Sequence, residues 1–132
     1  MSQIKIEYIG DLRTQSIHVD SGHEIVTDAP KDNQGLGRKF SPTDLLASSL
    51  GSCLLTIMGI VAKRHEIDMV GAIAKVNKKM SESPRRISEL NVEIILNKLL
   101  NDKNIALLKK AAEHCPVHNS LSKEIDIKII FN

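Results

Sequence analysis

The chain has 132 residues, a length that fits one domain with a single hydrophobic core. Hydrophobic residues make up 42% of it and charged residues 26%, a composition that argues against disorder. The formal net charge is only +2 and aromatic residues make up 2%, so the chain lacks the basic patch and stacking rings typical of nucleic-acid-binding proteins. We therefore expect one globular domain over residues 1–132 with no nucleic-acid partner.

The N-terminal sequence MSQIKIEYIG lacks the basic and apolar regions of a secretory signal, so we expect a cytoplasmic protein. Thiols are kept reduced in the cytoplasm, and the two cysteines there are more often free, catalytic or metal-bound than joined as a structural disulfide. Free cysteines can also be inert packing residues, because a thiol behaves as a small hydrophobic group.

Alternating apolar and polar residues predict three strands in the first part of the chain, at residues 3–9, 15–19 and 23–27. Turn residues separate them. Residues 28–39 contain Pro, Gly, Asn and Asp without apolar periodicity, so we expect a loop there.

A long helix is predicted after this loop. Ser41 fits the N-cap, Pro42 the first helical position, and Asp44 the acid of a capping box. Residues 45–62 carry no charge, which raises the possibility of a membrane span. The hydroxyl side chains and glycines in this segment, and the strands on both sides of it, favour instead the buried central helix of a soluble domain, without a membrane partner. Small residues in it would let another helix approach closely: Ala47, Gly51 and Gly59.

The rest of the chain predicts strands at residues 70–77, 87–97 and 124–131, with an amphipathic helix at 102–114 and a short helical turn after it. The resulting order is β-β-β-α-β-β-α-β. Strands grouped in this way are typical of an α+β fold with antiparallel sheets, here packed on the long central helix.

Cys53 lies near the middle of the predicted buried helix. An apolar environment disfavours the thiolate, so a reactive Cys53 needs a cation from elsewhere in the chain. Arg13, in the predicted loop after the first strand, and Arg38, just before the helix, are the candidates. The alternative is that Cys53 is an inert core residue.

Cys115 stands at a predicted helix break, in the sequence HCPVH of residues 114–118. Pro116 indicates that a new helix begins there, with Cys115 at its N-cap, where backbone N–H groups would stabilise a thiolate. The same residue ends the preceding helix, whose dipole acts in the opposite sense. The sequence leaves the direction of the net effect on the Cys115 pKa open.

Three motifs resemble the OsmC/Ohr family of osmotically inducible and organic-hydroperoxide-resistance proteins. Residues 40–53, FSPTDLLASSLGSC, resemble the helix that carries the first cysteine of the family. Residues 115–121, CPVHNSL, resemble its second cysteine motif, and residues 84–87, PRRI, fit the pattern before a strand. The resemblance spans nearly the whole chain and implies an intertwined homodimer in which both chains line each site.

The resemblance also implies a peroxidase reaction. Cys53 would attack an organic hydroperoxide and become a sulfenic acid, and Cys115 would condense with it to a disulfide. An external dithiol, such as a lipoyl protein or a thioredoxin-like donor, would reduce the disulfide, and no bound cofactor is implied. By its position, Arg13 is the residue that would stabilise the Cys53 thiolate.

One departure from the family pattern concerns the group that holds this arginine. Peroxidases of the family carry a Glu ten residues before the first cysteine, and here that position is Thr43. Asp44 is nine residues before Cys53 but is already explained as the acid of the capping box. Either Arg13 lacks its usual anchor, or Asp44 serves it in a different geometry.

Two other classes of function remain open from the sequence. A diverged relative would bind a small apolar molecule without turnover. A metalloprotein would use His114, Cys115, His118 and a distant Cys53 as ligands, although Pro116 and the lack of a C-x-x-C pair argue against this site.

Overall fold

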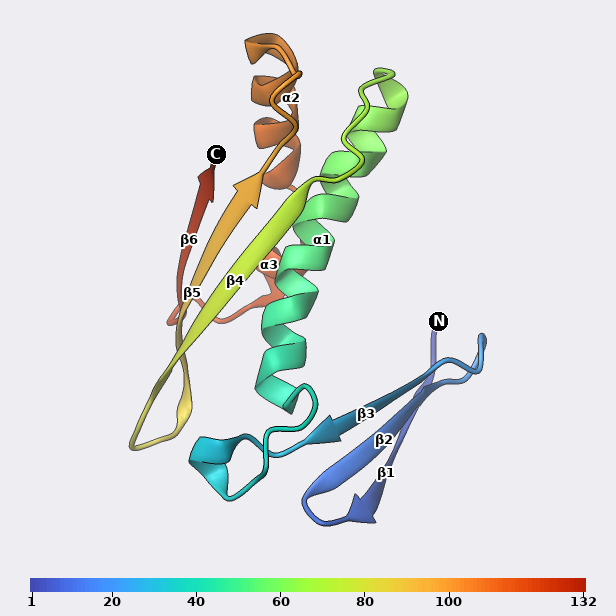
Figure 1. Cartoon of the computed structure of the whole chain (residues 1–132), viewed down its shortest axis with the longest axis vertical. Helices are drawn as coiled ribbons and strands as arrows, with labels where there is room; N and C mark the ends of the chain where they lie inside the picture. The colour runs from blue at the N-terminus through green and yellow to red at the C-terminus, as the bar shows by residue number, and fades with distance from the viewer. The chain divides into compact units, whose positions relative to one another are not determined.

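The computed structural model describes all 132 residues, which form two compact units, residues 1–45 and residues 46–132. Each unit contains its own three-stranded sheet (Figure 1). The elements follow the α+β order predicted from the sequence, with a short 3-10 turn, η1 (Lys31–Asn33), added in the predicted loop.

The first unit is an antiparallel sheet in the order β1-β2-β3. Its strands are β1 (Ile4–Gly10), β2 (Arg13–His18) and β3 (Glu24–Asp28). The prediction that Arg13 lies in a loop is wrong, because β2 begins at Arg13 rather than two residues later. A tight turn over Asp11 and Leu12, both with positive φ, leaves no room for a longer loop.

The connection from β3 to the helix folds back on itself around Gly35. A Cβ atom built on Gly35 would lie 1.8 Å from the carbonyl oxygen of Ala29, so no larger residue fits there. The Gly35 N–H donates to the carbonyl of Pro30 at 2.9 Å, and the Gly37 N–H donates to that of Ala29 at 3.1 Å. These bonds give the predicted loop a defined path despite its lack of periodic structure.

The long helix α1 (Pro42–Arg64) begins with the predicted capping box. The Ser41 N–H donates to Asp44 Oδ2 at 2.9 Å, and the Asp44 N–H donates to Ser41 Oγ at 3.1 Å. The two bonds satisfy donors that a helix start leaves without partners. By length and composition α1 could cross a membrane, a property it shares with the core helices of soluble proteins.

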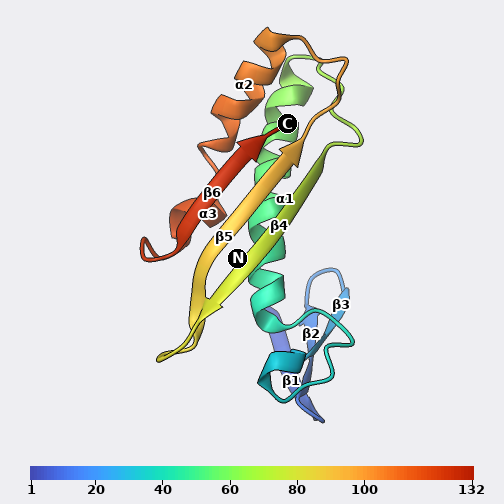
Figure 2. The ribbon, with the colours of Figure 1, turned by 60° about the vertical axis from the view of Figure 1, so that its left-hand side comes forward.

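The second unit contains a mixed sheet in the order β4-β5-β6 (Figure 2). The strand β4 (Ile73–Ser81) pairs antiparallel with β5 (Arg86–Ile95), whereas β5 pairs parallel with β6 (Asp126–Phe131). The expectation of antiparallel sheets therefore holds for every pairing except β5–β6. The connection over residues 96–125 contains two helices and is long enough to return the chain to the same end of the sheet.

Two helices fill this connection: α2 (Asp102–Ala112) and the one-turn α3 (Pro116–Ser120). On the other side of the sheet, β4 begins three residues later than predicted. Val70 is 87% exposed and Gly71 has φ +91°, so both belong to the turn that precedes the strand. The alternation of side chains continues through this turn as it does in the strand, so the sequence pattern does not show where the hydrogen-bonded ladder of β4 begins.

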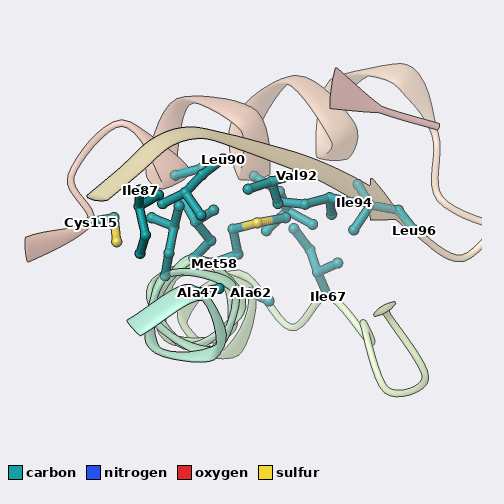
Figure 3. Close-up of a cluster of buried hydrophobic side chains, with 14 residues drawn as sticks. Ala47, Met58, Ala62, Ile67, Ile87, Leu90, Val92, Ile94, Leu96 and Cys115 are labelled. Atoms are coloured by element: carbon teal, nitrogen blue, oxygen red, sulfur yellow. The ribbon is translucent and has the colours of Figure 1, made fainter. Parts of the chain in front are cut away.

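The core of the second unit lies between α1, β5 and α2 (Figure 3). The buried residues of α1 recur every three or four positions, which places them on one side of the helix: Ala47, Leu50, Gly51, Leu54, Met58 and Ala62. They pack with the inward-facing residues of β5, among them Leu90, Val92 and Ile94, and with Leu108 of α2. Ser52, Thr56 and Ile60 of the same helix are exposed.

No second helix packs against the glycines of α1, contrary to the expectation that small residues there would let a helix approach. A Cβ atom on Gly51 would lie 3.0 Å from Val76 Cγ2 and 3.4 Å from the Cβ atom of Ala74, so Gly51 lets strand β4 approach the helix. A Cβ atom on Gly59 would meet nothing within 4 Å. Small residues permit close approach without specifying which element makes it.

Candidate functional site

The two cysteines of the second unit are free thiols, and they lie together although 62 positions separate them in the chain. Cys53 is half-buried on α1 and packs against the core. Cys115 is completely buried and occupies the N-cap of α3, as predicted. In Figure 3 Cys115 lies at the Ile87 end of the buried cluster.

The environment raises the pKa of the Cys115 thiol. Burial is the largest cause, and a hydrogen bond to the neighbouring Cys53 thiol is the next. The backbone N–H of His118, which donates to Cys115 Sγ at 3.4 Å, acts in the opposite direction. The sequence left the direction open between the N–H groups of α3 and the dipole of the preceding helix. The loss of water around the fully buried sulfur, which the sequence analysis did not weigh for Cys115, outweighs the N–H groups of α3.

A raised pKa keeps Cys115 protonated near neutral pH. The protonated Cys115 thiol is a neighbour of the Cys53 thiol. The lone pairs of Cys115 Sγ face the His118 N–H. The geometry gives the two thiols different positions: one is sealed in the core, and the other is partly open to solvent.

The charged candidates of the first unit gather around Asp28, a residue that the sequence reasoning missed. Arg38 donates to Asp28 Oδ2 through its Nε at 2.7 Å and through its backbone N–H at 3.1 Å. Arg13 faces Asp28 directly across the β2–β3 ladder. The sequence analysis placed Asp28 at the start of a loop, where Asp is common. The one signal that could have identified Asp28 is its position directly after a predicted strand.

The Asp28 side chain has no exposed surface. The hydrogen bond from Arg38 lowers its pKa against the effect of desolvation, and the positive charge of Arg13 contributes in the same direction. Asp28 in turn raises the pKa of Arg38. Since the Nε of Arg38 is already bonded to Asp28, its guanidinium is part of the cluster in the first unit.

Acid should destabilise the protein partly through Asp28. Its pKa in the folded chain lies below the value of about 4 for an unfolded Asp, so its stabilising contribution is present above pH 4 and is lost as pH falls through the folded pKa. Asp28→Asn should therefore flatten the decline of the free energy of unfolding below about pH 4. Urea titrations at a series of pH values measure this slope.

Glu24→Gln is the matched control, because Glu24 lies on the same strand, is exposed and bonds only Gln15 Nε2 at 2.9 Å. It should leave the slope nearly unchanged. Equal slopes for wild type and Asp28→Asn would contradict the assignment of a lowered pKa to Asp28.

The two remaining candidates lie in the first turn of α1. The hydroxyl groups of Thr43 and Ser41 are 3.1 Å apart, and the Asp44 carboxylate accepts the Ser41 N–H. The capping role predicted for Asp44 is thus confirmed. Thr43 brings no charge to this end of the helix.

The residues proposed as metal ligands do not form a metal site. No group of three or more His, Cys, Asp or Glu side chains is placed to hold an ion. His114 is exposed and His118 is half-buried, whereas Cys115 is turned into the core.

Comparison with known proteins gives one consistent result. The solved structure of a proposed osmotic stress induced and detoxification response protein from Psychrobacter arcticus 273-4 is 50% identical to this chain, has a TM-score of 0.94, and is matched over 100% of this chain and 96% of that chain. An OsmC-like protein from Mycoplasma pneumoniae is 19% identical, with a TM-score of 0.83 and coverages of 100% and 96%. The organic hydroperoxide resistance protein OhrB of Bacillus subtilis is 18% identical, with a TM-score of 0.71 and coverages of 100% and 98%. The last two are similar in fold.

None of the curated proteins matches this chain. The model of one protein family, described as OsmC-like protein, matches residues 34–130, a range that contains both cysteine motifs. With most of its length matched, and with a solved relative at 50% identity, this chain belongs to the OsmC-like protein family.

Proposed function

We propose that this chain is a thiol-dependent peroxidase that reduces organic hydroperoxides through Cys53 and Cys115. The observation that carries the proposal is the contact between a half-buried free thiol and a fully buried one. Its family membership, and relatives of the same fold named for organic hydroperoxide resistance, support the class of substrate.

In the first step the Cys53 thiolate attacks one oxygen of the hydroperoxide. The sulfur–oxygen bond forms as the oxygen–oxygen bond breaks, the departing alkoxide takes a proton to give an alcohol, and Cys53 is oxidised to a sulfenic acid. Cys53 suits this role because part of its side chain is accessible, whereas Cys115 is sealed and protonated.

In the second step Cys115 resolves the sulfenic acid. Its sulfur bonds to that of Cys53, and the hydroxyl of the sulfenic acid leaves as water with the Cys115 proton. An external dithiol then reduces the disulfide by exchange, which returns both thiols and oxidises the donor. A lipoyl protein or a thioredoxin-like protein has the required chemistry.

We assign to Arg13 the stabilisation of the Cys53 thiolate. The assignment comes from the resemblance to the family, and it answers the need of a thiolate in apolar surroundings for a cation. Arg38 is a weaker candidate, because its guanidinium is paired with Asp28.

The working form that we propose is a cytoplasmic homodimer. Strand β1 exposes Ile4, Ile6 and Tyr8, each by 59% or more, and contiguous apolar side chains of this kind are typical of an interface. A second copy of the chain is the partner that the family resemblance implies.

Treatment of the reduced protein with cumene hydroperoxide tests the proposed function. Two titratable thiols per chain should disappear, and a peptide containing the Cys53–Cys115 disulfide should appear in the mass spectrum. Thiols that stay unchanged would contradict the proposed peroxidase activity and favour a diverged module that binds an apolar ligand without turnover. Hydrogen peroxide at the same concentration serves as a control for the preference for organic substrates.

A further inference from the structure

We propose that Asp28 is a positioning residue for Arg13. Its buried carboxylate holds the guanidinium of Arg13 by charge, while Arg38 occupies its other oxygen. The proposal rests on the proposed peroxidase function only for the role of Arg13 in stabilising the Cys53 thiolate. The arrangement of Asp28, Arg13 and Arg38 itself lies within the first unit.

The strand register places the two side chains together. Arg13 is the first residue of β2 and Asp28 the last of β3, and they are direct partners in the antiparallel ladder. Side chains at such positions project from the same face of the sheet, with Cβ atoms about 5 Å apart. The positive charge of Arg13 is one of the influences that lower the pKa of Asp28.

Two buried polar atoms of this pair lack hydrogen-bond partners. They are Nε of Arg13, a donor, and Oδ1 of Asp28, an acceptor. Buried polar groups are normally paired, and an unpaired donor and acceptor on neighbouring side chains are complementary to one another. Asp28 Oδ2 is already used twice by Arg38, so Oδ1 is the oxygen available to Arg13.

The turn before Arg13 is held in a defined conformation, which fixes the position of the Arg13 backbone at the start of β2. Asp11 and Leu12 have φ of 54° and 60°, a region in which a leucine is uncommon. The Leu12 N–H donates to the Tyr8 hydroxyl at 3.3 Å, and its carbonyl accepts the Ala29 N–H at 3.1 Å. The second bond ties the turn before Arg13 to the residue after Asp28, so the two ends of the pair are joined through the backbone as well.

The charges around Asp28 explain why the cluster can retain a cation. Two guanidinium groups face one carboxylate, and only the Nε and backbone N–H of Arg38 are hydrogen-bonded to it. Arg38 also experiences the negative charge of Asp11. Asp28 supplies one negative charge for two guanidinium groups, and Asp11 acts on Arg38 only, so Asp28 can orient Arg13 while the Arg13 guanidinium keeps its charge for an anionic partner such as a thiolate.

Nuclear magnetic resonance of the ¹⁵N-labelled full chain tests the positioning directly. The Nε–H resonance of Arg13, assigned by its loss in Arg13→Lys, should be protected from solvent exchange in the wild type. Asp28→Asn should shift this resonance and speed its exchange, whereas Glu24→Gln, at the exposed start of the same strand, should leave it in place. An unprotected Arg13 resonance in the wild type overturns the proposal, even where Asp28→Asn fails to fold.

A double-mutant cycle on the oxidation of Cys53 supplies the functional readout. Asp28→Asn should slow the first turnover with cumene hydroperoxide on the order of tenfold to a hundredfold, the effect of misplacing a reacting group. In an Arg13→Lys background the same change should cost little more, because the two residues act as one unit. Losses that multiply independently would overturn the proposal and leave Asp28 with a structural role.

The two proposals fail in different ways. A wild-type protein that does not consume hydroperoxide would remove the peroxidase assignment, and the Arg13 resonance would still decide whether Asp28 positions this side chain. Arg38→Gln separates anchoring of the loop from positioning: it should lower stability while the Arg13 resonance stays protected, because the charge of Asp28 remains. Loss of that protection in Arg38→Gln alone, with Asp28→Asn unaffected, would contradict the assignment.

Discussion

Cys53→Ser should abolish hydroperoxide consumption, whereas Cys115→Ser should complete one turnover and stop. A serine hydroxyl at position 53 cannot form the sulfenic acid, so no step of the proposed cycle begins. Without Cys115, the sulfenic acid on Cys53 lacks the thiol that would condense with it. Stopped-flow consumption of cumene hydroperoxide and trapping of the sulfenic acid with dimedone measure the two outcomes.

The raised pKa of Cys115 strengthens the expectation that Cys53, and not Cys115, attacks the hydroperoxide. A protonated thiol is a poor nucleophile, and Cys115 stays protonated near neutral pH. Cys115→Ser also retains a hydroxyl at the N-cap of α3, a residue type that N-caps prefer, so the helix start should persist. Complete loss of the first turnover in both variants would contradict the assigned order of the two cysteines. A first turnover that survives Cys53→Ser would reverse it.

Leu54→Ala should destabilise the protein by about 3 kcal/mol, within the range for a leucine removed from a packed core. Leu54 has no exposed surface and belongs to the cluster between α1 and β5. The truncation removes buried apolar surface and leaves a cavity that rigid neighbours fill incompletely. Urea unfolding followed by circular dichroism gives the free energy.

Leu99→Ala provides the matched control, since Leu99 is 90% exposed in the turn before α2. It should change the free energy of unfolding by less than about 0.5 kcal/mol. A similar loss in both variants would show that burial in this core is not what determines stability.

The elements that were predictable are those with strong local signals. The capping box at Ser41 and Asp44 and the break at Cys115-Pro116 both place helix starts where the structure has them, whereas α2 ends two residues earlier than predicted. Boundaries set by tertiary pairing were less accessible. The start of β4 depends on a turn at Gly71, and the parallel β5–β6 pairing depends on where a long crossover returns the chain.

The candidate site divides in the same way. The resemblance singled out Cys53 and Cys115, and the fold brings them into contact. Asp28 escaped detection because its role depends on three separate segments: the hairpin turn before Arg13, the ladder that faces the two residues, and the loop that returns Arg38. The residue pattern of a single segment does not indicate that three separate segments come together around Asp28.

The wide spacing of the two sulfurs along the chain has a consequence for the oxidised protein. A bond between Cys53 and Cys115 would tie the middle of α1 to the start of α3 and enclose the intervening polypeptide in a covalent ring. For a ring of 63 residues the entropy lost by the unfolded ensemble corresponds to about 4 kcal/mol at 25 °C. Heat resistance would then follow the redox state of the cell, with the oxidised form outlasting the reduced one until a dithiol opens the ring.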